Sequence, residues 1–139
     1  GDSINADLSI DDKNLLMKAI VKAYINGEPE FDVHANIERA NMDKLNFISG
    51  YQFAISSIVN IDIKGTDLSS LNTDISLINS QLSFDDNQYQ IDSVNICKHT
   101  NNEMFTSTKI SSDIIDINAD GYYNIETVTS SFYNLVDNY

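Results

Sequence analysis

The sequence predicts an α+β domain in which N-terminal helices pack on one face of a curved antiparallel sheet, in the order α-α-β-α-β-β-β. Two observations predict this class. Apolar residues recur at helical spacing over residues 9–26, and the period changes to two over residues 51–64. The chain has 139 residues, 42% of them hydrophobic, which is enough to bury a core. We therefore expect one domain over residues 10–139, after a flexible polar lead-in over residues 1–9.

The first predicted helix covers residues 9–26. Ser9 and Asp12 have the spacing of a capping box, and Gly27 followed by Pro29, the only proline, ends the helix. Its apolar stripe at helical spacing consists of Leu15, Leu16, Ala19, Ile20, Ala23 and Tyr24. Because further apolar residues widen this stripe, we expect the helix to be buried on more than one side.

Two further helices are predicted. Residues 37–49 have a weaker helical pattern that ends at Gly50. Residues 68–82 carry apolar residues at the 3-4-3-4 spacing of a heptad, which favours one amphipathic helix packed on the sheet. A short helical seam between two copies is one alternative. A strand is the other, because Ile78, Leu82 and Phe84 also lie an even number of residues apart.

The strand predictions rest on alternation of apolar and polar residues. Residues 51–64 alternate over their whole length and give the strongest strand signal in the chain. Shorter strands are predicted over residues 89–98, 104–110 and 113–117, after a turn at Asp85–Gln88. The C-terminal segment fits both a strand and a helix.

This order of elements is similar to that of NTF2-like and cystatin-like folds. The similarity lies in the order and length of the elements and not in a motif. It implies helices laid over a curved antiparallel sheet. Because folds of this kind host enzymes and binding proteins alike, the similarity implies no particular function.

The chain is strongly acidic, with a net charge of −13 and a pI of about 4.1. Direct binding to nucleic acid is not expected, because it needs clustered cations. Membrane insertion is not expected either, because no apolar run approaches the roughly 18 residues of a membrane helix. Residues 65–139 carry more of the negative charge than residues 1–64, which favours a basic partner. An inhibitor that mimics nucleic acid is an alternative.

Cys97 is the only cysteine, so no internal disulfide can form.

Residues 116–127 resemble the calcium-binding loop of EF-hands and dockerin modules. Such a loop opens with oxygen ligands at positions 1, 3 and 5 and a glycine at position 6. These positions hold Asp116, Asn118, Asp120 and Gly121. The resemblance implies that calcium is the one cofactor to expect. Thr127 stands where the loop needs an acidic closing ligand, so a hairpin with its turn at residues 118–121 is the alternative.

Catalytic signatures are missing from the sequence. It contains no P-loop, no dinucleotide-binding glycine motif, no nucleophile elbow and no H-E-x-x-H motif. Cys97 and His99 are two residues apart, and in a strand this places their Cβ atoms about 7 Å apart. That distance is too long for an immediate thiolate–imidazolium pair. A small-ligand enzyme on a cone-like α+β fold is therefore an alternative and not the main hypothesis.

The main hypothesis is a non-catalytic protein-interaction module that binds a protein partner or a second copy of itself. Aromatic residues near the C-terminus are candidates for the interface, because tyrosine buries area while keeping a polar group. These candidates are Tyr122, Tyr123, Phe132 and Tyr133. We expect this module to be a secreted or surface protein, or a small partner-binding protein of bacterial or viral origin. A secreted, extracellular or periplasmic location is favoured if Gly1 is a mature or trimmed start.

Overall fold

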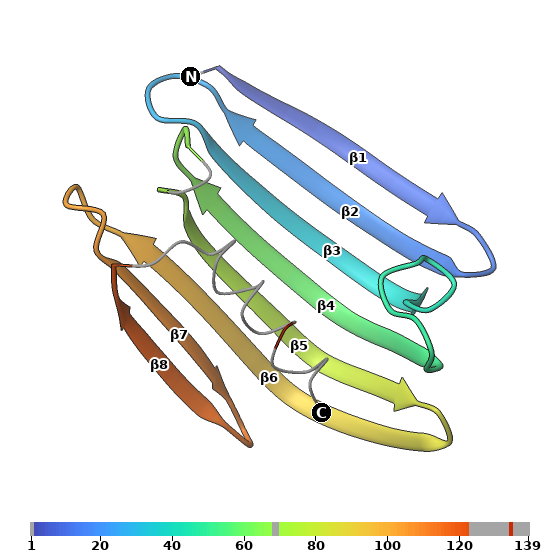
Figure 1. The fold of residues 1–139 in the computed structure, drawn as a ribbon. Coiled ribbons are helices and arrows are strands. Elements are labelled where there is room, and N and C mark those ends of the chain that lie inside the picture. The colour runs from blue at the N-terminus through green and yellow to red at the C-terminus, as the bar shows by residue number, and fades with distance from the viewer. Residues whose placement is uncertain (1, 68–69, 123–133, 135–139) are drawn as a thin grey trace.

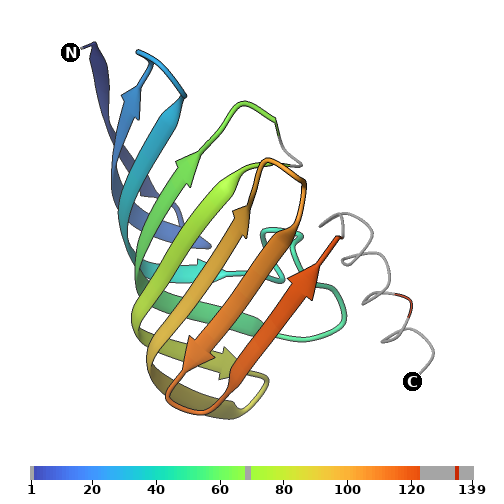
Figure 2. The same ribbon diagram turned by 90° about the vertical axis from the view of Figure 1, so that its left-hand side faces the viewer.

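The protein folds as one antiparallel sheet of eight strands, each paired with the strand that follows it in the chain (Figure 1). The structure, a computed structural model, describes residues 2–67, 70–122 and 134. The strands are β1 (Ser3–Asp11), β2 (Leu15–Tyr24), β3 (Glu30–Asn41), β4 (Phe53–Lys64), β5 (Asn72–Phe84), β6 (Asn87–Thr100), β7 (Thr106–Ser112) and β8 (Asp116–Gly121). Figure 2 shows that the sheet is a curved layer.

The predicted α+β class is wrong, because every secondary-structure element described over residues 2–67 and 70–122 is a strand. The predicted helix over residues 9–26 contains the end of β1, a tight turn and all of β2. Residues 37–49 contain the end of β3 and part of its connection to β4. The third predicted helix, residues 68–82, largely coincides with β5. Residues 3–9 of the predicted lead-in belong to β1. The similarity to NTF2-like and cystatin-like folds is lost, because it depended on the predicted helices.

β2 shows why a strand can resemble a helix in sequence. Its core-facing side chains alternate and are Met17, Ala19, Val21 and Ala23. Three more apolar residues, spaced by four, lie on the opposite side and are Leu16, Ile20 and Tyr24. Together the two sets imitate the stripe of an amphipathic helix. Their exposure separates them, since Ile20 is 48% exposed whereas Ala19 is buried.

Where alternation is strict, the strand predictions are confirmed. The strand predicted over residues 51–64 is β4, and the one over residues 89–98 lies within β6. The strand predicted over residues 104–110 is β7, which begins two residues later. The one predicted over residues 113–117 overlaps β8 only at residues 116–117, because residues 113–115 belong to the connection before β8. The turn predicted at Asp85–Gln88 is confirmed in its first two residues.

The strand register creates one apolar face and one polar face, because directly paired residues point to the same side. One row of the apolar face crosses all eight strands and consists of Ala6, Val21, Val33, Ile61, Ile75, Ile96, Ile110 and Ile117. The next row holds the buried core of Ala19, Ala35 and Val59, against which Leu77 packs. A row of the polar face consists of Asp7, Ile20, His34, Asn60, Ser76, Asn95, Ser111 and Asp116.

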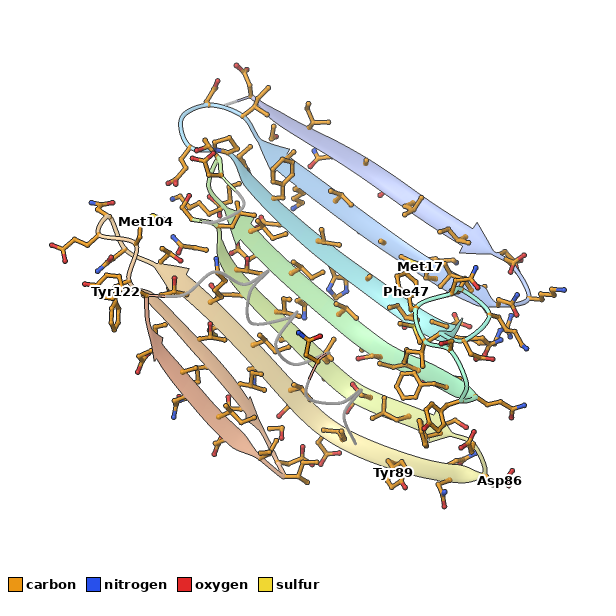
Figure 3. All side chains as sticks on the ribbon, in the orientation of Figure 1. Met17, Phe47, Asp86, Tyr89, Met104 and Tyr122 are labelled. Carbon is orange, nitrogen blue, oxygen red and sulfur yellow. The ribbon has the colours of Figure 1, made fainter. Side chains whose placement is uncertain are left out.

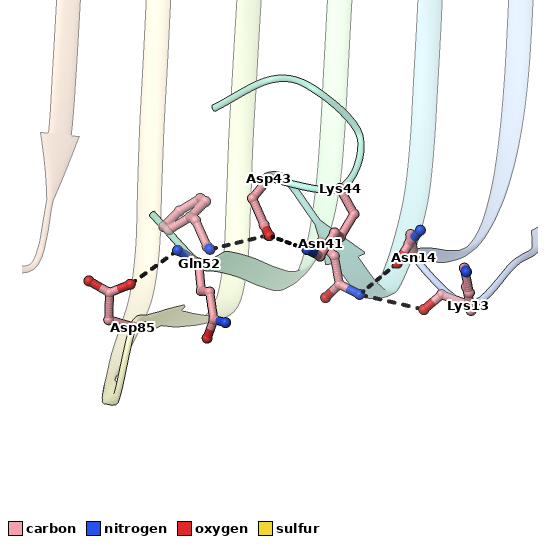
Figure 4. A network of polar contacts seen from close by, with 8 residues as sticks. Lys13, Asn14, Asn41, Asp43, Lys44, Gln52 and Asp85 are labelled. Carbon is pink, nitrogen blue, oxygen red and sulfur yellow. Dashed lines mark hydrogen bonds and ion pairs between the residues drawn. The ribbon is translucent and has the colours of Figure 1, made fainter. Parts of the chain in front are cut away.

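Polar contacts fasten the connections at one end of the sheet (Figure 4). The Asn41 side-chain amide donates to the Lys13 carbonyl at 3.5 Å and to Asn14 Oδ1 at 3.4 Å. These bonds join the β1–β2 turn to the end of β3. The Gln52 backbone N–H donates to the Asp85 carboxylate at 3.1 Å. The long connection between β3 and β4 is thereby tied to the turns on both sides of it.

Candidate functional site

A groove of about 510 Å³ crosses the polar face from β2 to β6. The strand register assembles this groove, because residues far apart in the sequence become neighbours on adjacent strands. Its titratable lining residues are Lys22, Asp32, His34, Asp62, Asp74 and Cys97. None of these was a candidate metal or interface residue in the sequence, where cross-strand neighbours cannot be recognised without the register.

Three aspartates meet in the middle of the groove. Asp32 on β3 pairs directly with Asp62 on β4, which pairs directly with Asp74 on β5. Like charges directly opposite each other in a sheet are destabilising. Burial raises the pKa of Asp62, and the negative charges of Asp32 and Asp74 raise it further, against a smaller lowering effect of Lys64. A proton or a cation at Asp62 therefore relieves repulsion within this row.

Asp62→Asn is expected to stabilise the protein at neutral pH, because it removes both repulsions at nearly constant side-chain volume. The free energy of unfolding should increase by about 0.2–1 kcal/mol for each like-charge pair removed. In the parent protein, stability should also rise as the pH falls through the raised pKa of Asp62, since the folded state then binds a proton more tightly than the unfolded chain.

Urea unfolding at neutral and mildly acidic pH measures both effects. The matched control is Asp86→Asn, which removes the same charge from the exposed β5–β6 turn. The repulsion is refuted if the two variants change stability equally at both pH values. It is also refuted if the pH dependence of the parent persists unchanged in Asp62→Asn.

Glu30 lies beside this row and completes a group of acidic side chains that can hold a metal ion. Oxygen atoms of Glu30, Asp32 and Asp62 lie within 4.8 Å of one another. Carboxylate oxygens are the ligands that Ca²⁺ and Mg²⁺ prefer. Lysines already oppose two of these carboxylates, since Lys64 pairs directly with Glu30 and Lys22 pairs directly with Asp32. The local negative charge is thus partly balanced by the protein itself.

Asp74 connects the thiol and the imidazole that lie two residues apart in the sequence. Its carboxylate lies 3.0 Å from His99 Nε2 and accepts a hydrogen bond from the Cys97 thiol. Burial acts to raise the pKa of Asp74, but the bonds from His99 and Cys97 outweigh it and lower the pKa. The bond to Asp74 and burial raise the pKa of the Cys97 thiol. The thiol is therefore held protonated, which is the opposite of an activated nucleophile.

A second polar chain runs across β3, β4 and β5 in the same groove. His34 Nδ1 is hydrogen-bonded to Asn60 Oδ1, and Asn60 Nδ2 donates to Ser76 Oγ at 3.3 Å. An amide and a hydroxyl orient the imidazole, and no carboxylate takes part in these two bonds. The chain therefore fixes side-chain positions in the groove.

The residues predicted to bind calcium lie in β8 and not in a loop. Asp116, Asn118 and Asp120 occupy alternate positions and point to the polar face, with successive Cβ atoms about 7 Å apart. Asp120 Oδ1 accepts a hydrogen bond from Ser107 Oγ at 2.5 Å. Residues 118–121 belong to the strand, so the alternative hairpin turn at these positions is wrong. Calcium binding by the three residues stays a prediction.

The predicted aromatic interface is described only at Tyr122. This residue is 72% exposed, and its ring packs edge-to-face on Phe105 with the ring centroids 5.3 Å apart. Figure 3 shows Tyr122 and Met104 at one end of the sheet and Tyr89 at the other. The remaining candidates, Tyr123, Phe132 and Tyr133, lie outside the described residues. Their role in binding a partner stays a prediction.

The edge strand β1 is the second candidate surface, because no described strand pairs with its outer side. Asp12 and Leu15 exchange backbone hydrogen bonds of 2.9 and 3.2 Å. Since bonded and non-bonded pairs alternate in an antiparallel ladder, the even-numbered residues of β1 bond to β2. The odd-numbered residues direct their N–H and C=O groups outward and are Ser3, Asn5, Asp7, Ser9 and Asp11.

β1 also lacks several of the features that usually protect an edge strand from pairing with another chain, although it carries two charged residues, Asp7 and Asp11. It is nine residues long, contains neither proline nor lysine, and pairs with β2 over its whole length without a bulge. Ile4 and Leu8 are 57% and 47% exposed on its apolar side. Sequence reasoning missed this strand, although Ile4, Ala6, Leu8 and Ile10 alternate with polar residues and are the signal that indicates it.

Comparison of the chain with protein-family models, curated proteins and solved structures found no match. Within the described ranges, no helix is long and apolar enough to cross a membrane. The groove and the β1 edge are the two candidate functional surfaces of the described residues.

Proposed function

We propose that the protein is a non-catalytic protein-binding module that takes up an extended segment of a partner as a ninth strand beside β1. The observation that carries this proposal is the complete row of outward backbone groups on a long edge strand without a bulge. In strand addition, main-chain hydrogen bonds to such a row supply affinity, and the side chains on the two faces supply specificity.

The chemistry of the groove supports binding over catalysis. Its thiol is held protonated by Asp74, and the carboxylates of Glu30 and Asp32 are opposed by lysines. A nucleophile activated by a neighbouring base would require the reverse arrangement, with a depressed thiol pKa. The chemistry of the groove therefore does not support a nucleophilic mechanism.

An NMR titration of isotope-labelled protein with a neutral peptide tests the proposal. The peptide has nine residues, which is the length of β1. It alternates valine with threonine and is N-methylated along one edge, so that it cannot stack on itself. We expect saturable shifts in the β1 and β2 amides. The outward amides of β1 should also become protected from hydrogen exchange, because they gain acceptors.

Two variants at one position separate the backbone from the side chain. Asp7→Pro removes an outward N–H from the middle of β1 without touching a bond to β2, so it should abolish binding and leave the fold intact. Asp7→Ala keeps the N–H and should still bind the neutral peptide. Strand addition at β1 is refuted if the parent shows no saturable shift in β1, or if Asp7→Pro binds as well as Asp7→Ala.

A further inference from the structure

We infer that the segment which pairs with β1 alternates apolar residues with lysine or arginine, an inference that rests on the proposed function. Residues directly opposite each other in an antiparallel pair share a face, with Cβ atoms about 4.5–5.5 Å apart. An antiparallel ninth strand therefore continues both faces of β1. Each face of β1 sets its own requirement on the occupant.

The apolar side of β1 requires apolar residues from the occupant. Ile4 and Leu8 are 57% and 47% exposed. Leu8 pairs directly with Ala19, which is 5% exposed and belongs to the core. The apolar row is thus buried at β2 and exposed at β1, one strand further out. An apolar residue opposite Leu8 extends this row and removes the Leu8 side chain from water.

The polar side of β1 favours cations in the occupant. Asp7 and Asp11 point to this side, and neither takes part in an ion pair of the described residues. The lysines on the same side, Lys18 and Lys22, belong to β2. A ninth strand lies about 4.8 Å from β1 and about twice as far from β2. The second distance exceeds the screening length of about 8 Å at physiological salt. The electrostatic interaction of the occupant with the β1 carboxylates is therefore stronger than its interaction with the β2 lysines.

The same charges disfavour a second copy of this chain as the occupant. A second β1 would bring its own Asp7 and Asp11 to the shared edge, and each chain carries a net charge of −13. Like charges repel at this separation, whereas a basic segment is attracted to the acidic protein as it approaches. The occupant that the edge fits best is therefore an extended segment of a different, basic chain.

Three matched peptides test the inference. All have nine residues and N-methyl groups along one edge, and they alternate valine with lysine, with threonine or with glutamate. Titration calorimetry should rank the lysine peptide tightest and the glutamate peptide weakest. The expected ratio of dissociation constants between these two is on the order of tenfold, from a few cross-strand charge pairs. The preference for lysine should shrink as salt is added.

Variants locate the charge effect on β1. In Asp7→Asn with Asp11→Asn, the lysine and threonine peptides should bind equally well, because the carboxylates are gone and the backbone row remains. The control is Asp86→Asn with Glu103→Gln, which removes the same number of charges from exposed turns elsewhere. This control should retain the preference for lysine. Asp7→Pro should bind none of the peptides.

Each other outcome overturns the inference in a distinct way. If the threonine peptide binds at β1 and the lysine peptide binds no tighter, the charge preference is wrong and the proposed function stands. If no peptide binds, the proposed function fails as well. If the lysine peptide binds Asp7→Pro as it binds the parent, its site is elsewhere on the acidic surface. A dimer in light scattering that Asp7→Pro dissociates would identify the occupant as a second copy.

Discussion

Ala35→Asp is expected to unfold the protein or to bring it close to unfolding. Ala35 is 4% exposed and lies in the core between its direct partners Ala19 and Val59. An aspartate there places a carboxylate among apolar side chains with no cation opposite it. An unpaired charge in such a position costs several kcal/mol. That cost is a large part of the roughly 5–15 kcal/mol by which a domain is stable.

The neighbouring residue provides a matched control. Asn36 points to the polar face, is exposed, and pairs directly with Lys18. Asn36→Asp introduces the same side chain one residue away, and we expect it to change the free energy of unfolding by less than about 0.5 kcal/mol. Urea unfolding followed by circular dichroism compares the two variants. Equal stability of the two variants would show that Ala35 does not face a buried core.

The sheet face on which each apolar residue lies explains which part of the fold the sequence can predict. β4 was predicted correctly, because its apolar and polar residues alternate over the whole strand. β2 was predicted as a helix, because Ile20 and Tyr24 are apolar but lie on the polar face. β5 was predicted as a helix for a related reason, since Ile78 is 38% exposed and interrupts its alternation. Local spacing cannot report which face of a sheet an apolar residue occupies.

The groove was beyond sequence reasoning for a different physical reason. Asp74 lies far from Cys97 and His99 in the chain, and only the pairing of β5 with β6 brings the three together. The same holds for Asp32 and Asp62, which meet through the pairing of β3 with β4. A motif search reads residues that are close in sequence, whereas a meander places its cross-strand neighbours a hairpin apart. The sequence shows that Cys97 and His99 lie two residues apart, but it does not show that Asp74 lies beside them.

Bulges determine where hydroxyl groups can be buried in this sheet. The β4–β5 pairing shifts between Ser56 and Ile58, and Asn79 opposite has a left-handed φ of 52°. Ser57 and Ser80 are brought together there, 4% and 2% exposed, with their hydroxyl oxygens 2.8 Å apart. A small polar pair thus fills a position where the regular apolar row is interrupted.

Ser57→Ala is expected to destabilise the protein by about 1–3 kcal/mol, because it leaves the buried Ser80 hydroxyl without its partner. Ser80→Ala should cost less, since the Ser57 hydroxyl still reaches the carbonyl oxygens of Ile58 at 3.2 Å and Ile78 at 3.4 Å. The double variant should cost less than the sum of the single variants, because it leaves neither hydroxyl unsatisfied. Urea unfolding of the parent, the two single variants and the double variant gives the coupling energy between the two hydroxyls, and we expect at least about 0.5 kcal/mol.

Ser9→Ala, at an exposed position of β1, controls for the loss of a hydroxyl in a strand. Additive effects of Ser57→Ala and Ser80→Ala would mean that the two hydroxyls do not depend on each other, and that the bulge is held by its backbone alone.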